Sequence, residues 1–137
     1  MSDPDFEVVK RAWTMGSATD RQIDDEFFEF LHEDIEIVPF GAKMEGRSYR
    51  GRHGVLEWLD TEVRTNWDYF FTIPEKFERV GDKLLVGGRW RARGKGSGVE
   101  LERPATWVIE VRDGKIAHWQ TYTDRDEALR DLGLAKS

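Results

Sequence analysis

Three histidines, an alternating run of arginines and six tryptophans are the residues of this sequence whose types could do chemistry. His32, His53 and His118 have no partner at the spacing of a zinc site. Because the chain has no cysteine, it has no thiol nucleophile, no cysteine-ligated metal and no disulfide framework. We therefore predict no metal site and no cofactor.

The arginines pose a question of direction. Arg89 opens a run, 89–93, in which arginines alternate with Trp90 and an alanine, so a strand must place the arginines on one face and the indole on the other. An arginine facing inward needs a carboxylate, for which Glu36 and Glu110 are candidates, because an unpaired buried guanidinium is costly. A pocket of that kind would prefer a ligand with an acidic or enol oxygen. Arginines facing outward would contact solvent or a second subunit, and the sequence leaves both arrangements open.

Four tryptophans lie on elements that could surround a cavity: Trp13, Trp58, Trp107 and Trp119. Large flat side chains of this kind either pack as ordinary core or line an apolar pocket, and both interpretations remain open. If Trp119 and Thr121 face a pocket, strict alternation puts His118 on the opposite face of the strand, which is the convex face if the sheet is curved around that pocket. There it would be a surface or interface residue rather than a general base.

Helical periodicity comes first along the chain and strand alternation dominates the second half. The 137 residues are predicted to form one domain, residues 1–137, of the α+β class. Apolar spacing and turn residues predict helices at 6–15, 19–31 and 55–66, a strand at 34–38, strands at 69–79, 83–93, 100–112 and 116–123, and a short last helix capped by Asp124 and ended by Gly133.

Composition excludes several classes of function. A net charge of −6 disfavours broad attraction to nucleic acid. The N-terminus is acidic and no apolar run follows it, so we expect no membrane span and a cytoplasmic protein. The glycine-rich segment 94–98 joins two strands and precedes no helix, which argues against a phosphate-binding loop.

Three sequence segments, Tyr49–Val55, Gly94–Glu100 and Asp113–Asp124, occur at set positions within the predicted order of helices and strands. Together they resemble the SnoaL-like family of the NTF2-like superfamily, over about Phe6 to Leu134. The resemblance implies an NTF2-like (cystatin-like) cone-shaped barrel, in which three N-terminal helices cover a curved antiparallel sheet and a short helix ends the chain. It also implies a homodimer through the convex sheet face and an apolar pocket between helices and sheet. Relatives include polyketide cyclases, ketosteroid isomerases and limonene epoxide hydrolases.

The catalytic residues of those relatives are mostly missing. The epoxide hydrolases that this chain resembles carry Arg-x-Asp and a second Asp. At the corresponding positions this chain has Arg89-Trp90-Arg91 and Thr121, so only the arginine matches. The isomerases place their base just before a proline, where this chain has Val38, which cannot take a proton. Asp124 is the nearest late carboxylate for a cyclase, but we interpret it as a helix cap. The catalytic residues are therefore unknown.

Two functions follow as expectations. The first is a SnoaL-like small-molecule binding protein, or an enzyme with cyclase-, isomerase- or hydrolase-like acid–base chemistry, that takes an apolar compound into an aromatic-lined pocket. The pocket residues that we expect are Trp13, Trp58, Arg89, Trp107, Trp119 and Thr121. The alternative is a non-catalytic dimerisation module that pairs through a convex patch around His118, Gln120 and Tyr122.

Overall fold

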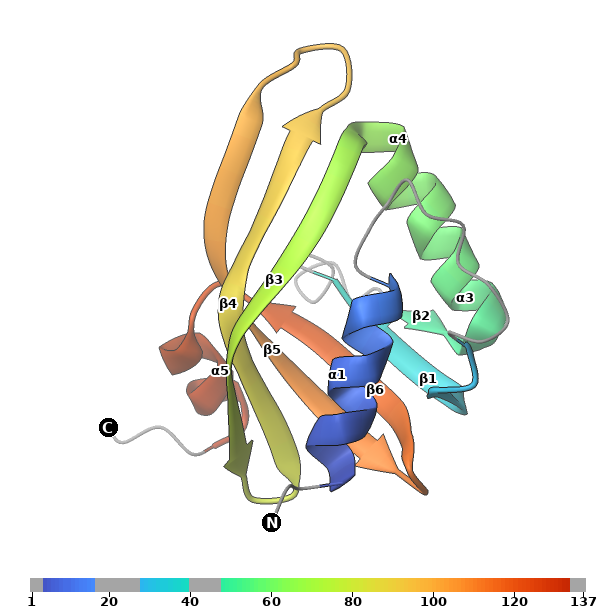
Figure 1. Cartoon of the computed structure of the whole chain (residues 1–137), viewed down its shortest axis with the longest axis vertical. Helices are drawn as coiled ribbons and strands as arrows, with labels where there is room; N and C mark the ends of the chain where they lie inside the picture. Colours follow the sequence, from blue (N-terminus) through green and yellow to red (C-terminus); the bar gives the residue numbers. More distant parts are fainter. Residues whose placement is uncertain (1–3, 17–27, 40–47, 134–137) are drawn as a thin grey trace.

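A computed structural model describes residues 4–16, 28–39 and 48–133 of the chain (Figure 1). The helix predicted at 19–31 falls largely outside these residues, and its last position, Leu31, belongs instead to a strand. The described elements are α1 (Pro4–Gly16), β1 (Leu31–Val38), β2 (Tyr49–Arg50), α3 (Gly51–Trp58), a π-helical turn (Leu59–Val63), α4 (Arg64–Asn66), β3 (Trp67–Val80), β4 (Lys83–Gly94), β5 (Glu100–Arg112), β6 (Lys115–Tyr122) and α5 (Arg125–Asp131).

Six strands form one sheet in the order β2-β1-β6-β5-β4-β3. Short turns join β3 through β6 into antiparallel neighbours, as alternation and the turn residues predicted. The sheet is nevertheless mixed rather than wholly antiparallel, because β1 pairs with β6 in parallel. The two strands are far apart in sequence and no tight turn constrains their direction, so β1 can fill the free edge of β6 in either sense.

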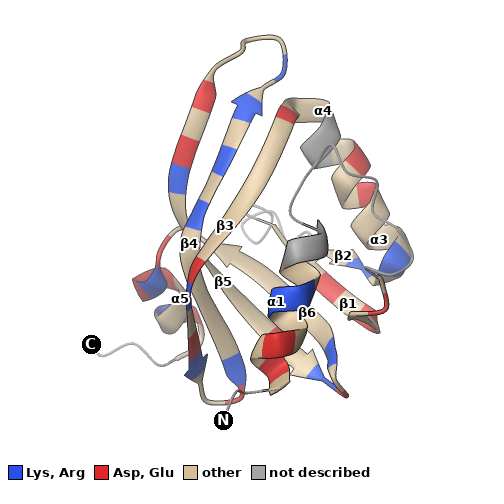
Figure 2. Cartoon of the chain, viewed as in Figure 1, with Lys and Arg blue, Asp and Glu red and all other residues tan. Residues whose placement is uncertain are grey.

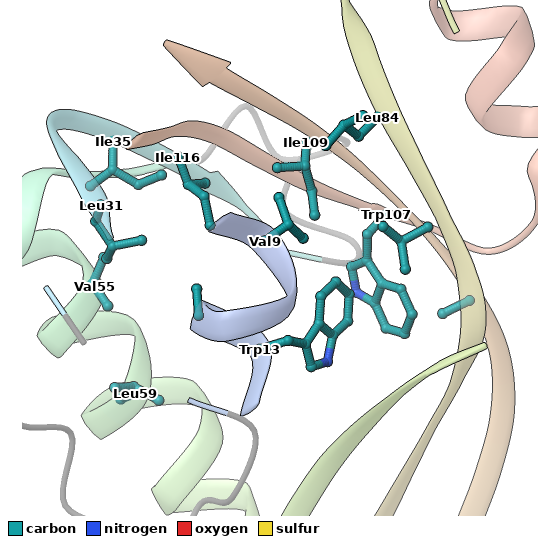
Figure 3. Packing of buried hydrophobic residues seen from close by; sticks show 13 residues of the cluster. Val9, Trp13, Leu31, Ile35, Val55, Leu59, Leu84, Trp107, Ile109 and Ile116 are labelled. Atoms are coloured by element: carbon teal, nitrogen blue, oxygen red, sulfur yellow. The ribbon is translucent and has the colours of Figure 1, made fainter. Parts of the chain in front are cut away.

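Helices α1 and α3 lie over the concave face of this sheet (Figure 1). Val9, Ala12 and Trp13 of α1 and Val55 and Leu59 of the α3 segment are buried there against inward-facing residues of the strands (Figure 3). Those inward residues are Leu31, Ile35, Leu84, Val86, Ala105, Trp107, Ile109 and Ile116. The main core therefore lies between the helices and the concave face.

Helix α5 packs on the opposite, convex face, where Ala128 contacts a smaller buried cluster with Leu85, Val108 and Tyr122. Asp124 caps this helix, since its side chain accepts a hydrogen bond from the main-chain N–H of Glu127 at 2.8 Å. The predicted cap is confirmed.

Two glycines are required by close approach of the backbone. A Cβ on Gly54 would lie 2.9 Å from the main-chain carbon of Tyr49, so α3 can pack tightly against β2 only without a side chain there. A Cβ on Gly88 would lie 2.0 Å from the carbonyl oxygen of Ile73, next to the irregularity in the pairing of β3 with β4. Both positions therefore fix local packing rather than chemistry.

Candidate functional site

All six tryptophans of the chain lie on the concave side. Trp13 and Trp107 belong to the main core, and Trp58, Trp90 and Trp119 pack against it. Trp67 contacts Trp90, with ring centroids 6.1 Å apart. Because alternation gives a strand residue either face, the gathering of every indole on one side is the clearest asymmetry of this sheet.

Trp13, Trp107 and Trp119 form what we term the indole cluster. The ring of Trp13 on α1 lies 4.9 Å from that of Trp107 on β5 at an interplanar angle of 80° (Figure 3). It lies 4.6 Å from the ring of Trp119 on β6. The Nε1–H of Trp13 donates to the hydroxyl of Thr72 on β3 at 2.9 Å. The helix is thus fixed to three strands, and its indole has the hydrogen-bond partner that burial demands.

A second group, the arm cluster, consists of Trp67, Phe70 and Trp90 on the long β3–β4 hairpin. Phe70 and Trp90 stack at 5.6 Å with 20° between their rings, and Trp67 lies 6.3 Å from Phe70. Thr72 pairs directly with Trp90 in the sheet, so the residue that holds Trp13 also adjoins the arm cluster. The two aromatic groups are therefore neighbours on one face.

Of the predicted pocket residues, the structure brings Trp13, Trp107 and Trp119 into ring contact and places Trp58 against the same core. Thr121 pairs opposite Trp107 and shares its face. The arm cluster and Thr72 were missed. Leu84, Val86, Trp90 and Ala92 alternate on one apolar side of their strand, and this pattern favours an inward-facing Trp90, which is one of the two arrangements that the sequence left open.

Arg89 does not join this group. It lies on the convex face, with its side chain 44% exposed, and it forms ion pairs with Glu102 and, at 3.5 Å, with Glu75. Neither carboxylate suggested by the sequence is its partner. The question of direction is thereby answered: burial of Leu84, Val86 and Ala92 on the concave side turns the arginines outward.

The convex face carries a row of charges across neighbouring strands. Glu36 on β1 accepts from Arg50 on β2 at 2.9 Å, and one of its oxygens lies 3.2 Å from Nδ1 of His118 on β6. His118 is therefore on the convex face, where alternation predicted it. Its Nε2 lies 3.2 Å from the side-chain oxygen of Gln120, so both ring nitrogens face oxygen atoms.

An open cleft of about 580 Å³ lies along this row, and we term it the charged cleft. Its lining is Glu33, Asp34, Glu36, Arg50, Gly51, Glu110, Arg112, Ala117 and His118. Lys83 donates to Glu110 at 2.8 Å and, with Arg112 and His118 nearby, holds the pKa of that carboxyl below its usual range. The cleft is lined mainly by groups that already neutralise one another.

Tyr122 is not available at this surface, although the sequence suggested it as part of an exposed convex patch. It is 2% exposed beneath α5 and donates to a carboxylate oxygen of Asp131 on that helix. Burial and that carboxylate raise the pKa of the Tyr122 hydroxyl above its usual range. His118 and Gln120 remain partly exposed beside it.

A family model described as the SnoaL-like domain matches residues 9–119, which is most of the chain. The chain belongs to the SnoaL-like domain family. Its curved sheet, with α1 and α3 on the concave side, is the NTF2-like α+β cone fold of that family, and the sheet is not closed. A search of the curated proteins finds no match.

Solved structures agree with this fold. TerC, crystallised with polyporic acid, is 22% identical with a TM-score of 0.75, and the match covers 95% of this chain and 98% of TerC. The protein Rv0760c of Mycobacterium tuberculosis, in complex with estradiol-17β-hemisuccinate, is 17% identical with a TM-score of 0.69 and coverages of 91% and 97%. A candidate SnoaL-like polyketide cyclase from Jannaschia sp. CCS1 is 15% identical with a TM-score of 0.72 and coverages of 98% and 94%.

No group of three or more histidine or acidic side chains in residues 4–16, 28–39 and 48–133 is arranged to hold a metal ion. Within the same residues, no helix has both the length and the apolar character needed to cross a membrane.

Proposed function

We propose that this SnoaL-like domain binds an apolar, ring-bearing small molecule on its concave face. The partly exposed Trp58 and Trp119 would contact the ligand directly, the buried Trp13 and Trp107 would form the apolar layer behind them, and Thr121 would supply a polar contact. The observation that carries the proposal is the gathering of all six indoles on that face. Indoles present large, flat surfaces to a ligand at low entropic cost, and apolar sites with few polar groups are typical of small-molecule pockets.

Solved structures of similar fold also support small-molecule binding. The folds of TerC and Rv0760c were each solved with a small organic molecule, polyporic acid and an estradiol ester respectively. Among the described residues, the hydroxyls of Thr72 and Thr121 adjoin the indole cluster, and that of Thr72 already accepts the hydrogen bond of Trp13. Aromatic rings and a hydroxyl are sufficient for binding of an apolar compound, whereas acid–base catalysis also uses a carboxylate or an imidazole. We therefore propose binding as the basic activity.

Tryptophan fluorescence tests the proposal. Titration with a panel of planar apolar compounds, 1,4-naphthoquinone among them, is expected to quench the emission of the wild-type protein with a saturable curve. Trp119→Leu is expected to weaken this binding, because Trp119 is half-buried at the edge of the indole cluster. Arg91→Gln on the convex face is the matched control. Titrations that stay linear for every compound, as collisional quenching does, would contradict the proposal.

A second candidate is a dimerisation module that pairs through the convex face. The charges of the charged cleft favour it. A two-fold axis would bring this row of positive and negative side chains against the same row of a second copy running the opposite way, so that opposite charges could pair. Arg112→Glu changes the sign of an exposed lining residue, whose side chain is 53% exposed and lies 3.9 Å from Glu110. Sedimentation velocity is expected to show a weakened dimer for this variant. An unchanged dimer would contradict pairing through this cleft.

A further inference from the structure

Arg103 on β5 differs from the three nearby arginines of β4 in the face that it occupies and in its ion pairing. Arg89, Arg91 and Arg93 lie on the convex face, and each has a carboxylate within 4 Å, from Glu102 or Asp68. Figure 2 shows the result as basic bands along β4 beside acidic bands along β5. The arginines of that face are therefore neutralised within the chain.

Arg103 points to the other face. It pairs directly with Trp90 in the sheet, and Trp90 pairs with Thr72, so the three residues form one row across β5, β4 and β3 on the concave side. Thr72 is the residue that accepts the hydrogen bond of Trp13. A single row thus links the exposed guanidinium, the arm cluster and the indole cluster.

The guanidinium of Arg103 forms one hydrogen bond and no ion pair within the described residues. Its Nη1 donates to the main-chain carbonyl of Glu102 at 2.9 Å. No carboxylate in residues 4–16, 28–39 and 48–133 forms an ion pair with it, so its positive charge is not neutralised by that part of the chain. An unneutralised arginine beside stacked aromatic rings is complementary to a ligand that has a planar apolar body and an anionic end.

We propose that the concave site selects planar aromatic acids, with the rings of the ligand on the arm and indole clusters and its carboxylate or enolate on Arg103. This rests on the proposed function, since it names the chemical class of ligand for the same site. Trp107 is four positions after Arg103 in the extended strand β5, which is a distance of about 13 Å along the strand. A ligand of two or three fused or linked rings has that length.

Isothermal titration calorimetry with 2-naphthoate and the neutral 2-naphthylmethanol separates charge from ring. The wild-type protein is expected to bind the acid about fivefold more tightly, the scale of a partly exposed ion pair, and to lose this preference at high salt. Arg103→Gln should bind both probes with the affinity of the alcohol, and Arg103→Lys should recover part of the difference. Arg91→Gln removes the same charge from the convex face and should keep the full preference.

The outcomes distinguish this inference from the proposed function. Equal binding of acid and alcohol to the wild-type protein, or a preference that persists in Arg103→Gln, would overturn the role of Arg103 and leave binding at the indoles intact. Failure of both probes to bind would overturn the inference, and the proposed function falls with it only if every compound of the fluorescence panel also fails. Because Arg103 is exposed, its substitution is not expected to alter the fold, and an unchanged unfolding midpoint will confirm that.

Discussion

The concave and convex faces of this sheet come from the same strands and differ at every second residue. On the concave face, ring contacts join Trp13, Trp107 and Trp119, and one indole hydrogen bond ties α1 to Thr72. On the convex face, outside the area that α5 covers, Glu36 and Glu110 are held by ion pairs with Arg50 and Lys83. Burial of aromatic surface contributes several times more stability per residue than exposed ion pairs do.

The difference also separates the roles of the two faces. The convex charges named above have partners within the chain, whereas the concave face combines six indoles with Arg103, which no carboxylate of the described residues neutralises. A small apolar molecule is therefore expected on the concave side, and any protein partner on the convex side. The following predictions test how sharply this division holds.

The largest effect is expected from Trp107→Ala. Trp107 is 2% exposed in the centre of the concave core, so the substitution leaves a large cavity and should lower the free energy of unfolding by about 3–5 kcal/mol. Urea denaturation followed by circular dichroism measures the change. Arg91→Ala on the convex face should cost less than about 1 kcal/mol. Similar losses for the two variants would contradict the contrast between the faces.

Thr72→Val is expected to have an intermediate effect. The substitution keeps the shape of the side chain and removes the acceptor of the Trp13 indole N–H, which should cost about 1–2 kcal/mol because the donor is largely buried. Thr121→Val is the control, since this hydroxyl has no hydrogen-bond partner in the described part of the chain. If both variants unfold at the same urea concentration, the Trp13–Thr72 bond does not stabilise the position of α1.

The smallest effect concerns Lys83 and Glu110 on the convex face. The pKa of Glu110 is lowered in the folded protein, so its contribution is present above the ordinary value of 4.5 and is lost as the pH falls through the lowered value. Lys83→Met should therefore cost at most about 1 kcal/mol near pH 6.5 and progressively less toward pH 3. Lys115→Met, which removes an exposed lysine, is the control. A cost of Lys83→Met, relative to this control, that does not change with pH would show that the ion pair is not its origin.

Much of the architecture could be predicted from the sequence because its signals are local. Strand alternation gave β3 to β6 to within a few residues, and the cap at Asp124 depends only on its neighbours in α5. The parallel pairing of β1 with β6 could not be predicted, because nothing local sets the direction of two strands so far apart. The burial of Tyr122 depends on where α5 docks, which alternation within β6 does not reveal.

The candidate site was predictable only in part for a similar reason. The indoles were found by type, but the direction of the run 89–93 depends on register: Glu102 lies opposite Arg91 on the next strand, and Glu75 lies at an irregularity of β3. The same register sets Arg103 beside Trp90, a juxtaposition that no sequence spacing encodes. The sequence therefore pointed to an arginine at the pocket and indicated Arg89, whereas the geometry favours Arg103.

Nuclear magnetic resonance of protein labelled with ¹⁵N-tryptophan tests the central claim most directly, because the chain offers six indole N–H signals on one face. On titration with 2-naphthoate, the signals of Trp13, Trp107 and Trp119 are expected to shift together in a saturable manner. In a uniformly labelled sample, the main-chain signals of His118 and Gln120 on the convex face should stay in place. Saturable shifts confined to the convex signals, or no shifts at all, would contradict a ligand site on the concave face.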